Sequence, residues 1–157
     1  MVVDAREFEL CEPVDMAVST FDSVNHIMSI DGLRAVFERV HAALTPGGRF
    51  VIDLNMEDGF MERWRGAYVI DKPDEFIVAE SSYDPEERVG AAKFTWFVPE
   101  DGTWQRNSLS LTQRCYDQPD VESALLSVGF REVKGFDAAD LMSSRQTGRT
   151  FFSAVKE

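Results

Sequence analysis

The chain has 157 residues, about the size of one domain, and its 44% hydrophobic content argues against a disordered polypeptide. Its formal net charge of −12 argues against nucleic acid and anionic membrane surfaces as partners, because both are bound through clustered Lys and Arg. No apolar run approaches the roughly 20 residues that cross a membrane. We therefore expect a soluble, cytoplasmic protein whose two cysteines, Cys11 and Cys115, are reduced.

Two apolar strands with a helix between them are predicted in the first third of the chain. The first strand spans 14–21, and its nearly continuous apolar pattern is typical of a strand covered on both faces. It ends in a polar elbow at 22–26, and Ser29 is a suitable N-cap for the helix that follows. The Gly47-Gly48 pair ends this helix before a second strand at 49–55. Two strands joined by a crossover helix run parallel, and ligands bind at their carboxyl ends, so the elbow is the first candidate site.

An antiparallel sheet is predicted in the middle of the chain. A short helix comes first, at 56–64, in which Phe60, Met61 and Trp64 share one face. Turn signals rich in Pro, Asp and Gly then separate four strand-like segments, at 67–70, 76–83, 89–98 and 103–116. Consecutive strands joined by short turns form a meander, which we expect to be an insert over 65–117.

The tail returns to the α/β pattern. A helix at 119–128 ends at Gly129, and strands follow at 130–136 and 150–155. The polar segment 137–148 between these strands is expected to be a short helix and a loop. The sequence therefore predicts the α/β class, with a partly parallel sheet and an antiparallel insert in one domain, 1–157. Because Met1 to Val3 has the pattern of a strand end, we expect this domain to be incomplete at its N-terminus.

Four segments together resemble one enzyme family. They are the strand and elbow at 14–26, the Leu44-Thr45-Pro46-Gly47-Gly48 turn before a strand, the junction at 125–130 and the final strand. In this order they resemble the C-terminal two-thirds of a class I S-adenosylmethionine-dependent methyltransferase. The meander resembles the antiparallel insert of its small-molecule N-methyltransferases. The resemblance implies a Rossmann-like sheet, S-adenosylmethionine as cofactor, and methyl transfer to a nitrogen or oxygen nucleophile of a small molecule.

The resemblance also implies which residues bind the cofactor. Asp4 and Ala5 match the end of the family's third strand, which recognises adenine, and Phe21 and Asp22 match the motif beside the methionine part. The family's Gly-rich G-x-G-x-G loop has no counterpart in these 157 residues. An alternative is therefore an inactive remnant of the family that acts as an interaction module. It would form a homodimer through the strand at 14–21, since an exposed sheet edge tends to pair with another chain.

Catalytic side chains are expected at the elbow. His26 could take a proton from an attacking amine or hydroxyl, with Asn25 beside it as the second candidate. The alternative is a His26 that only bonds the backbone at the entry of the helix. No His, Cys or carboxylate cluster has the spacing of metal ligands, so we expect no metal site.

Substrate-binding side chains are expected in the meander. Aromatic faces suit a cationic sulfonium or an amine, although aromatic residues of a sheet can also be plain core. The candidates are Tyr83, Trp96, Trp104, Arg114 and Tyr116.

Overall fold

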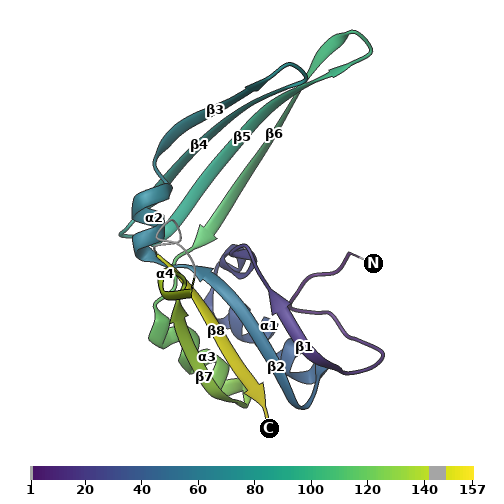
Figure 1. Ribbon diagram of the computed structural model, residues 1–157, viewed down its shortest axis with the longest axis vertical. Helices are drawn as coiled ribbons and strands as arrows, with labels where there is room; N and C mark the ends of the chain where they lie inside the picture. The colour runs from purple at the N-terminus through teal and green to yellow at the C-terminus, as the bar shows by residue number, and fades with distance from the viewer. Residues whose placement is uncertain (1, 142–147) are drawn as a thin grey trace.

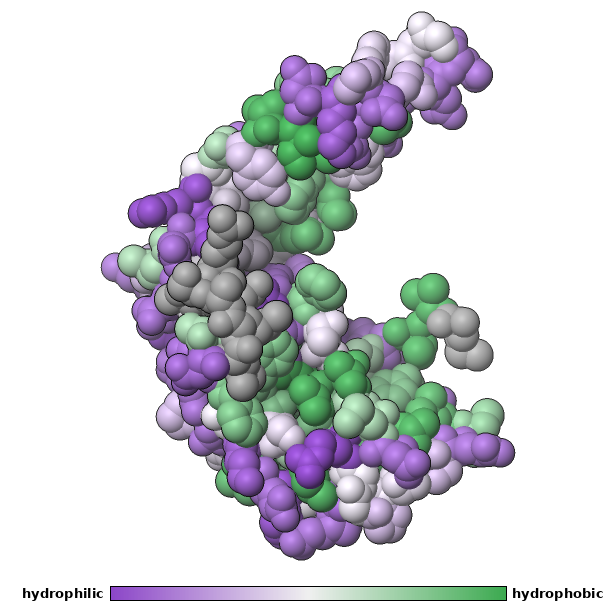
Figure 2. All heavy atoms as spheres, viewed as in Figure 1, coloured by the Kyte–Doolittle hydropathy of each residue, from purple (hydrophilic) through white to green (hydrophobic). Residues whose placement is uncertain are grey.

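The computed structural model describes residues 2–141 and 148–157, and two four-stranded sheets are found in this part of the chain. One sheet has the strand order β1-β2-β8-β7, and the other is the meander β3-β4-β5-β6. Their bounds are β1 Val14–Ser19, β2 Leu44–Asn55, β8 Arg149–Lys156, β7 Phe130–Asp137, β3 Gly66–Lys72, β4 Glu75–Asp84, β5 Val89–Glu100 and β6 Thr103–Arg114. Figure 1 shows the meander extending from one end of the first sheet, so that the two enclose an open angle. In Figure 2 this angle is a hollow with hydrophobic residues on both walls.

The first sheet begins with the predicted βαβ unit. β1 and β2 run parallel, with Ala17 opposite Phe50, and α1 (Ile30–Ala43) connects them. Ser29 caps this helix, because its Oγ accepts a hydrogen bond from the N–H of Gly32 at 3.1 Å. β8 then pairs antiparallel with both β2 and β7. The prediction of a partly parallel α/β sheet is confirmed.

Helices α1 and α3 (Gln118–Val128) pack against each other on one face of the first sheet. α1 buries its predicted apolar stripe, in which Leu33 and Phe37 have no exposed surface. α3 ends at Gly129, whose φ of +113° lies in the left-handed region that glycine tolerates best. Each fully buried Leu or Phe side chain contributes about 1.5–3 kcal/mol, so this layer holds the α/β half together.

β1 forms an edge of the first sheet. The prediction that both of its faces are covered is wrong, because Met16 and Val18 are 55% and 57% exposed. Their neighbour Ala17 packs against the core on the other face, where the helices lie. Val2 and Val3, predicted to end an upstream strand, are exposed and lie in no strand. β1 is therefore covered on one face and open along one side.

The meander confirms the predicted antiparallel insert and runs from Gly66 to Arg114. Because side chains alternate along a strand, each face receives every second residue. Ala79 lies opposite Phe94, and Ala92 lies opposite Leu111, and these four share the face that looks into the hollow.

Helix α2 (Glu57–Arg63) connects the first sheet to the meander. Phe60 is fully buried, and its ring centroid lies 5.1 Å from that of Trp64. Gly90 of β5 permits this packing, because a Cβ at that position would lie 2.7 Å from both rings. The prediction that Met61 shares the buried face is wrong: it is 55% exposed, since it lies about 100° around the helix from Phe60.

The predicted helix and loop at 137–148 are described in part. α4 spans Ala138–Leu141, and the expectation for 142–147 lies outside the described residues. Within residues 2–141 and 148–157, no helix is long and apolar enough to cross a membrane.

Candidate functional site

The elbow after β1 has a strained backbone. Phe21 and Asp22 both adopt positive φ, 60° and 48°, which is uncommon for residues that have a Cβ. Asp22 then precedes the short 3-10 helix η1 (Ser23–His26), and its N–H donates to Asp53 Oδ1 at 3.2 Å. Phe21 is 84% exposed, so it is not a core residue. The elbow therefore presents one aromatic ring and one carboxylate at the carboxyl end of β1.

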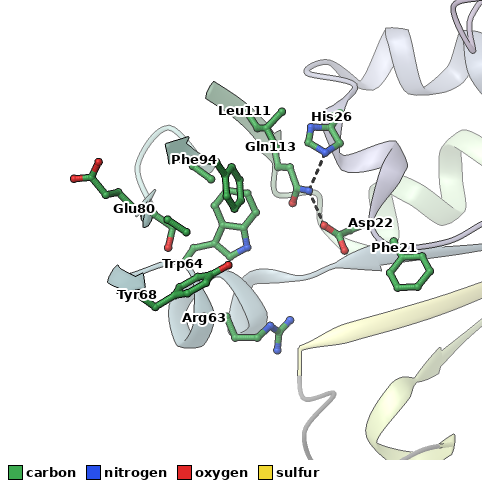
Figure 3. A pocket seen from close by; sticks show the side chains of 13 residues that line it. Phe21, Asp22, His26, Arg63, Trp64, Tyr68, Glu80, Phe94, Leu111 and Gln113 are labelled. Carbon is green, nitrogen blue, oxygen red and sulfur yellow. Dashed lines mark hydrogen bonds between the residues drawn. The ribbon is translucent and has the colours of Figure 1, made fainter. Parts of the chain in front are cut away.

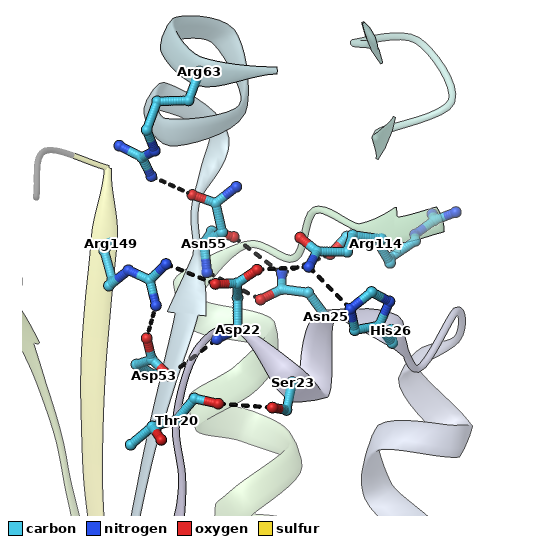
Figure 4. Close-up of polar contacts among 11 residues, drawn as sticks. Thr20, Asp22, Ser23, Asn25, His26, Asp53, Asn55, Arg63, Arg114 and Arg149 are labelled. Atoms are coloured by element: carbon cyan, nitrogen blue, oxygen red, sulfur yellow. Dashed lines mark hydrogen bonds and ion pairs between the residues drawn. The ribbon is translucent and has the colours of Figure 1, made fainter. Parts of the chain in front are cut away.

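Asp22 is the centre of a polar network that joins the elbow to three strands (Figure 4). Its Oδ1 accepts from Arg149 Nη2, and its Oδ2 accepts from Gln113 Nε2, both at 2.6 Å. Arg149 Nη1 also donates to Asp53, whose side chain is only 2% exposed. Two carboxylates thus share one guanidinium at this end of the sheet.

The imidazole of His26 bonds to the meander through both of its nitrogens. Nδ1 lies 2.9 Å from the carbonyl oxygen of Thr112, and Nε2 lies 3.2 Å from Gln113 Nε2. Because a carbonyl oxygen only accepts, Nδ1 carries the proton and donates it. Nε2 then accepts from the Gln113 amide, so the lone pair of His26 is already engaged.

Asn25 connects the end of β2 to the end of β6. Its Nδ2 donates to the carbonyl oxygens of Asn55 and Arg114 at 3.0 and 2.8 Å, and its Oδ1 accepts from the Asn55 N–H at 3.0 Å. The side chain has no exposed surface. These contacts use both donors and the acceptor, so the geometry supports a structural role for Asn25 rather than the predicted catalytic one.

A cavity of about 330 Å³ opens between the elbow and the meander (Figure 3). The elbow contributes Phe21, Asp22 and His26. The end of α2, the residue after it and the concave face of the meander supply the other lining residues, which are Arg63, Trp64, Tyr68, Ala79, Glu80, Ser81, Ala92, Phe94, Leu111 and Gln113. Its walls thus combine the aromatic rings of Trp64, Tyr68 and Phe94 with the Asp22 carboxylate and the Arg63 guanidinium. Aromatic faces of this kind can attract cationic or amine-bearing ligands.

Known proteins were compared with the chain in three ways. No family model matches it, and no curated protein matches it. Solved structures do match. An S-adenosylmethionine-dependent methyltransferase from Clostridium acetobutylicum has a TM-score of 0.84 at 19% identity, and the match covers 99% of this chain and 63% of that one. A sugar N-methyltransferase from Streptoalloteichus gives 0.77 at 17% identity, with 99% and 61% covered. An amino pentose methyltransferase from Micromonospora echinaspora gives 0.72 at 20% identity, with 99% and 63% covered.

The chain has the class I methyltransferase fold. It spans about three-fifths of the length of these neighbours. The predicted fold is thereby confirmed, including the Rossmann-like sheet and its antiparallel insert.

The predicted cofactor residues of this methyltransferase fold divide into two pairs. Phe21 and Asp22 line the cavity. Asp4 and Ala5 are not among its described lining residues, and Asp4 accepts from Arg6 Nη2 at 2.6 Å. This hydrogen bond lowers the pKa of Asp4 to about 2, so its carboxylate is ionised at neutral pH. The residue is exposed. Phe21 and Asp22 are therefore the predicted cofactor residues that lie next to the cavity.

The predicted substrate residues Tyr83 and Tyr116 lie at structural positions. The Tyr83 ring stacks on Phe60 with centroids 5.0 Å apart, and burial raises the pKa of its hydroxyl. The Tyr116 hydroxyl donates to the carbonyl oxygen of Ile27, and burial raises its pKa to about 12. Neither tyrosine is among the described residues that line the cavity.

The remaining predicted substrate residues also lie outside the described lining. Trp96 is two residues beyond Phe94 along β5, and Arg114 lines a separate recess together with Tyr116. Trp104 lines another recess of the meander. The structure instead brings Trp64, Tyr68 and Phe94 together at the cavity, and none of these three was singled out from the sequence as a substrate residue.

Three polar residues of the site were not singled out from the sequence. Asp53 carried a signal, because it ends an otherwise apolar strand beside the one that leads to the elbow. Gln113 and Arg149 carried none, because only the pairing of distant strands brings them to Asp22. Within the described residues, no group of three His, Cys, Asp or Glu side chains could hold a metal ion.

Proposed function

We propose that this protein transfers a methyl group from S-adenosylmethionine to a nitrogen or oxygen nucleophile of a small molecule. The observation that carries the proposal is the cavity at the carboxyl end of β1, where Phe21, Asp22 and His26 face the meander. This is the position at which open α/β sheets bind ligands. The fold adds support, as do the sugar and amino pentose methyltransferases among its structural neighbours.

The elbow fits the charged part of the proposed cofactor. When bound, S-adenosylmethionine supplies a methyl group on a positively charged sulfur. The exposed ring of Phe21 can attract a cation through its face, and the Asp22 carboxylate adds negative charge beside it. We retain Asp4 and Ala5 as the proposed contacts to adenine. The chain spans about three-fifths of its neighbours' length, so the activity of the whole protein is likewise a proposal.

The meander side of the cavity would hold the methyl acceptor. Trp64, Tyr68 and Phe94 offer aromatic faces, on which a small molecule with an amine can lie. The nucleophile's lone pair forms the new bond to the methyl carbon as the carbon–sulfur bond breaks, and the nucleophile gives up one proton. Holding the reacting groups in line can supply about 7–11 kcal/mol of the barrier, so binding geometry is the main contribution of these residues.

We propose His26 as the proton acceptor. Its Nε2 lone pair accepts a hydrogen bond from Gln113 in the structure, so Gln113 has to turn before His26 can take a proton. General-base help of this kind contributes about 10²–10⁴-fold to a rate. Asn25 is given the supporting role of holding η1 in place.

Transfer of a labelled methyl group tests the proposed reaction. The chain is incubated with methyl-labelled S-adenosylmethionine and either benzylamine or benzyl alcohol, and label in the organic product is counted. We expect label in one of the two products and at least a tenfold lower rate for His26→Ala. Transfer to neither probe by a chain that binds S-adenosylmethionine would contradict the proposed reaction.

A second candidate function is an interaction module that forms a homodimer through β1. It is favoured by the open edge of this strand, where Met16 and Val18 are more than half exposed. An unpaired strand edge offers backbone donors and acceptors to a second strand. The predicted cytoplasmic location suits either function and is proposed with them.

A further inference from the structure

The end of the meander that lies farthest from the first sheet carries a second recess (Figure 1). Its volume is about 550 Å³, and it is lined by Asp71, Lys72, Pro73, Phe76, Phe97 and Trp104. Strand pairing places Asp71 opposite Phe76 and Phe76 opposite Phe97, so these three share one face. Asp71 is three residues from Tyr68, and Phe97 is three residues from Phe94, so this face is the one turned away from the hollow.

Three aromatic rings gather in this recess. The ring centroids of Phe76 and Phe97 are 6.1 Å apart, with their planes at 57° to each other. Trp104 lies on the same face, because it pairs with Pro99, two residues beyond Phe97. Its side chain is 52% exposed, so the indole is not part of a core. A group of exposed aromatic residues of this kind marks a surface for binding.

The Asp71 carboxylate adds a negative charge beside the rings. It is exposed, and among the described residues it has no hydrogen bond or ion pair. Lys72 does not neutralise it, since its Nζ lies 2.9 Å from Glu75 Oε2 and its side chain alternates to the other face. Arg106 lies opposite Phe97, three strands away from Asp71. The turns at this end add further acidic residues, Asp74, Glu100 and Asp101.

This lining suits a cation that carries no hydrogen-bond donors. Aromatic faces attract positive charge, and Asp71 is the only carboxylate in the described lining. A primary ammonium has three N–H donors and would exchange bonds to water for contacts with rings that do not replace them. A quaternary ammonium spreads its charge over methyl groups and needs no acceptor. The volume of the recess is that of a pocket for a small molecule.

We propose that this recess binds a small organic cation through a quaternary ammonium group. Phe76, Phe97 and Trp104 contact the N-methyl groups, and Asp71 balances the charge. The recess and the elbow cavity lie on opposite faces of the meander, so this ligand is a second one and the inference does not depend on the proposed methyl transfer.

Two probes of equal shape test the role of the charge. Choline carries a quaternary ammonium, and dimethylbutanol is its neutral isostere, in which a carbon atom replaces the charged nitrogen. Titrations followed through the methyl proton signal of each probe give the dissociation constants. We expect choline to bind saturably and about tenfold more tightly than dimethylbutanol, because only the cation is attracted by the aromatic faces and by Asp71. Equal affinities, or no saturable binding of choline, would overturn the proposal.

The three tryptophans of the chain report where choline binds. Trp104 lines the recess, Trp64 lines the elbow cavity, and Trp96 shares the face of Phe94. In a ¹H–¹⁵N spectrum we expect the indole N–H signal of Trp104 to shift on addition of choline, while the other two stay in place. A saturable shift of Trp64 or Trp96 without one of Trp104 would place choline elsewhere and overturn the proposal.

Variants of the lining separate the contributions of the ring and the charge. Trp104→Ala should weaken choline binding about tenfold, and Trp104→Phe, which keeps an aromatic face, should retain most of it. Asp71→Asn should weaken it about fivefold. Leu109→Ala, exposed on the other face of β6, and Glu38→Gln, which removes an exposed charge from α1, are the matched controls and should bind as the wild type does. Wild-type affinity in Trp104→Ala would overturn the proposal.

Two further measurements distinguish other occupants of the recess. Light scattering that shows a dimer which dissociates in Trp104→Ala, in a chain that does not bind choline, would identify a second copy as the occupant. A peptide with one trimethyl-lysine that binds more than tenfold tighter than choline would assign the recess to a protein partner. Either result would overturn the proposal of a small-molecule site.

Discussion

Arg149 Nη2 lies 2.6 Å from Asp22 Oδ1, so the last strand of the chain holds the elbow that follows the first. The same guanidinium pairs with Asp53, which is nearly inaccessible to solvent. A strained backbone at Phe21 and Asp22 persists only when its surroundings fix it, and this ion pair is one of the contacts that do so. The candidate site is therefore built by strands that are far apart in the sequence.

Replacement of Arg149 tests this link. Arg149→Met leaves the buried carboxylate of Asp53 without its counter-ion, so we expect the free energy of unfolding to fall by about 3 kcal/mol. Urea unfolding followed by circular dichroism measures it. Arg131→Met, which removes an exposed arginine, is the control and should change stability by less than about 0.5 kcal/mol. Adding Asp53→Asn to Arg149→Met should restore part of the loss, and failure to do so would contradict the ion-pair explanation.

Asn25 should matter for stability more than for chemistry. Asn25→Ala leaves the Asn55 N–H and two carbonyl oxygens without their partner, and we expect a loss of about 3 kcal/mol in the free energy of unfolding. The matched substitution Asn107→Ala, at an exposed position of β6, should be close to neutral. Thermal and urea unfolding of both variants measure the difference. Equal stabilities would show that the buried contacts of Asn25 contribute little.

Local pattern predicted the elements of this fold but only part of the site. The apolar period of 30–44 predicted α1 because it is encoded in consecutive residues. The prediction that Gly47-Gly48 ends this helix is wrong, because α1 ends at Ala43 and the Gly pair lies inside β2. The turn signals of the meander likewise predicted its four strands. Trp96 shares the face of Phe94 but lies two residues farther along β5, outside the described lining of the cavity. How far along a strand the cavity extends depends on the packing of α2 and the elbow, which the pattern of the strand does not encode. Arg149 reaches Asp22 through the pairing of β8 with β2, which no local pattern encodes.

Stability should depend on pH through His41. Burial lowers the pKa of this imidazole, and the nearby positive charge of Lys156 lowers it further. The unfolded chain, with a His pKa of about 6.5, then binds a proton more readily than the folded one, so stability is full above pH 6.5 and is lost as the pH falls through the lower folded value. Urea midpoints between pH 5 and 8 should show this slope in the wild type and a smaller one in His41→Gln. An identical slope in both would exclude His41 as the cause.

The open edge of β1 predicts a concentration-dependent dimer if the second candidate function is correct. Val18→Lys places a charge on the exposed face of this strand, which should disfavour strand pairing. Size-exclusion chromatography with light scattering is expected to give a dimer for the wild type and a monomer for Val18→Lys. A wild-type chain that remains monomeric at every accessible concentration would count against the interaction module.

Isothermal titration of S-adenosylmethionine into the chain measures the binding proposed for the elbow. We expect saturable binding of one molecule per chain, weakened about tenfold in Phe21→Ala, because this variant removes the exposed ring beside Asp22 and leaves the core intact. Phe136→Ala, at another partly exposed phenylalanine, should bind as the wild type does. A folded wild-type chain that shows no saturable binding would disprove a cofactor site at the elbow.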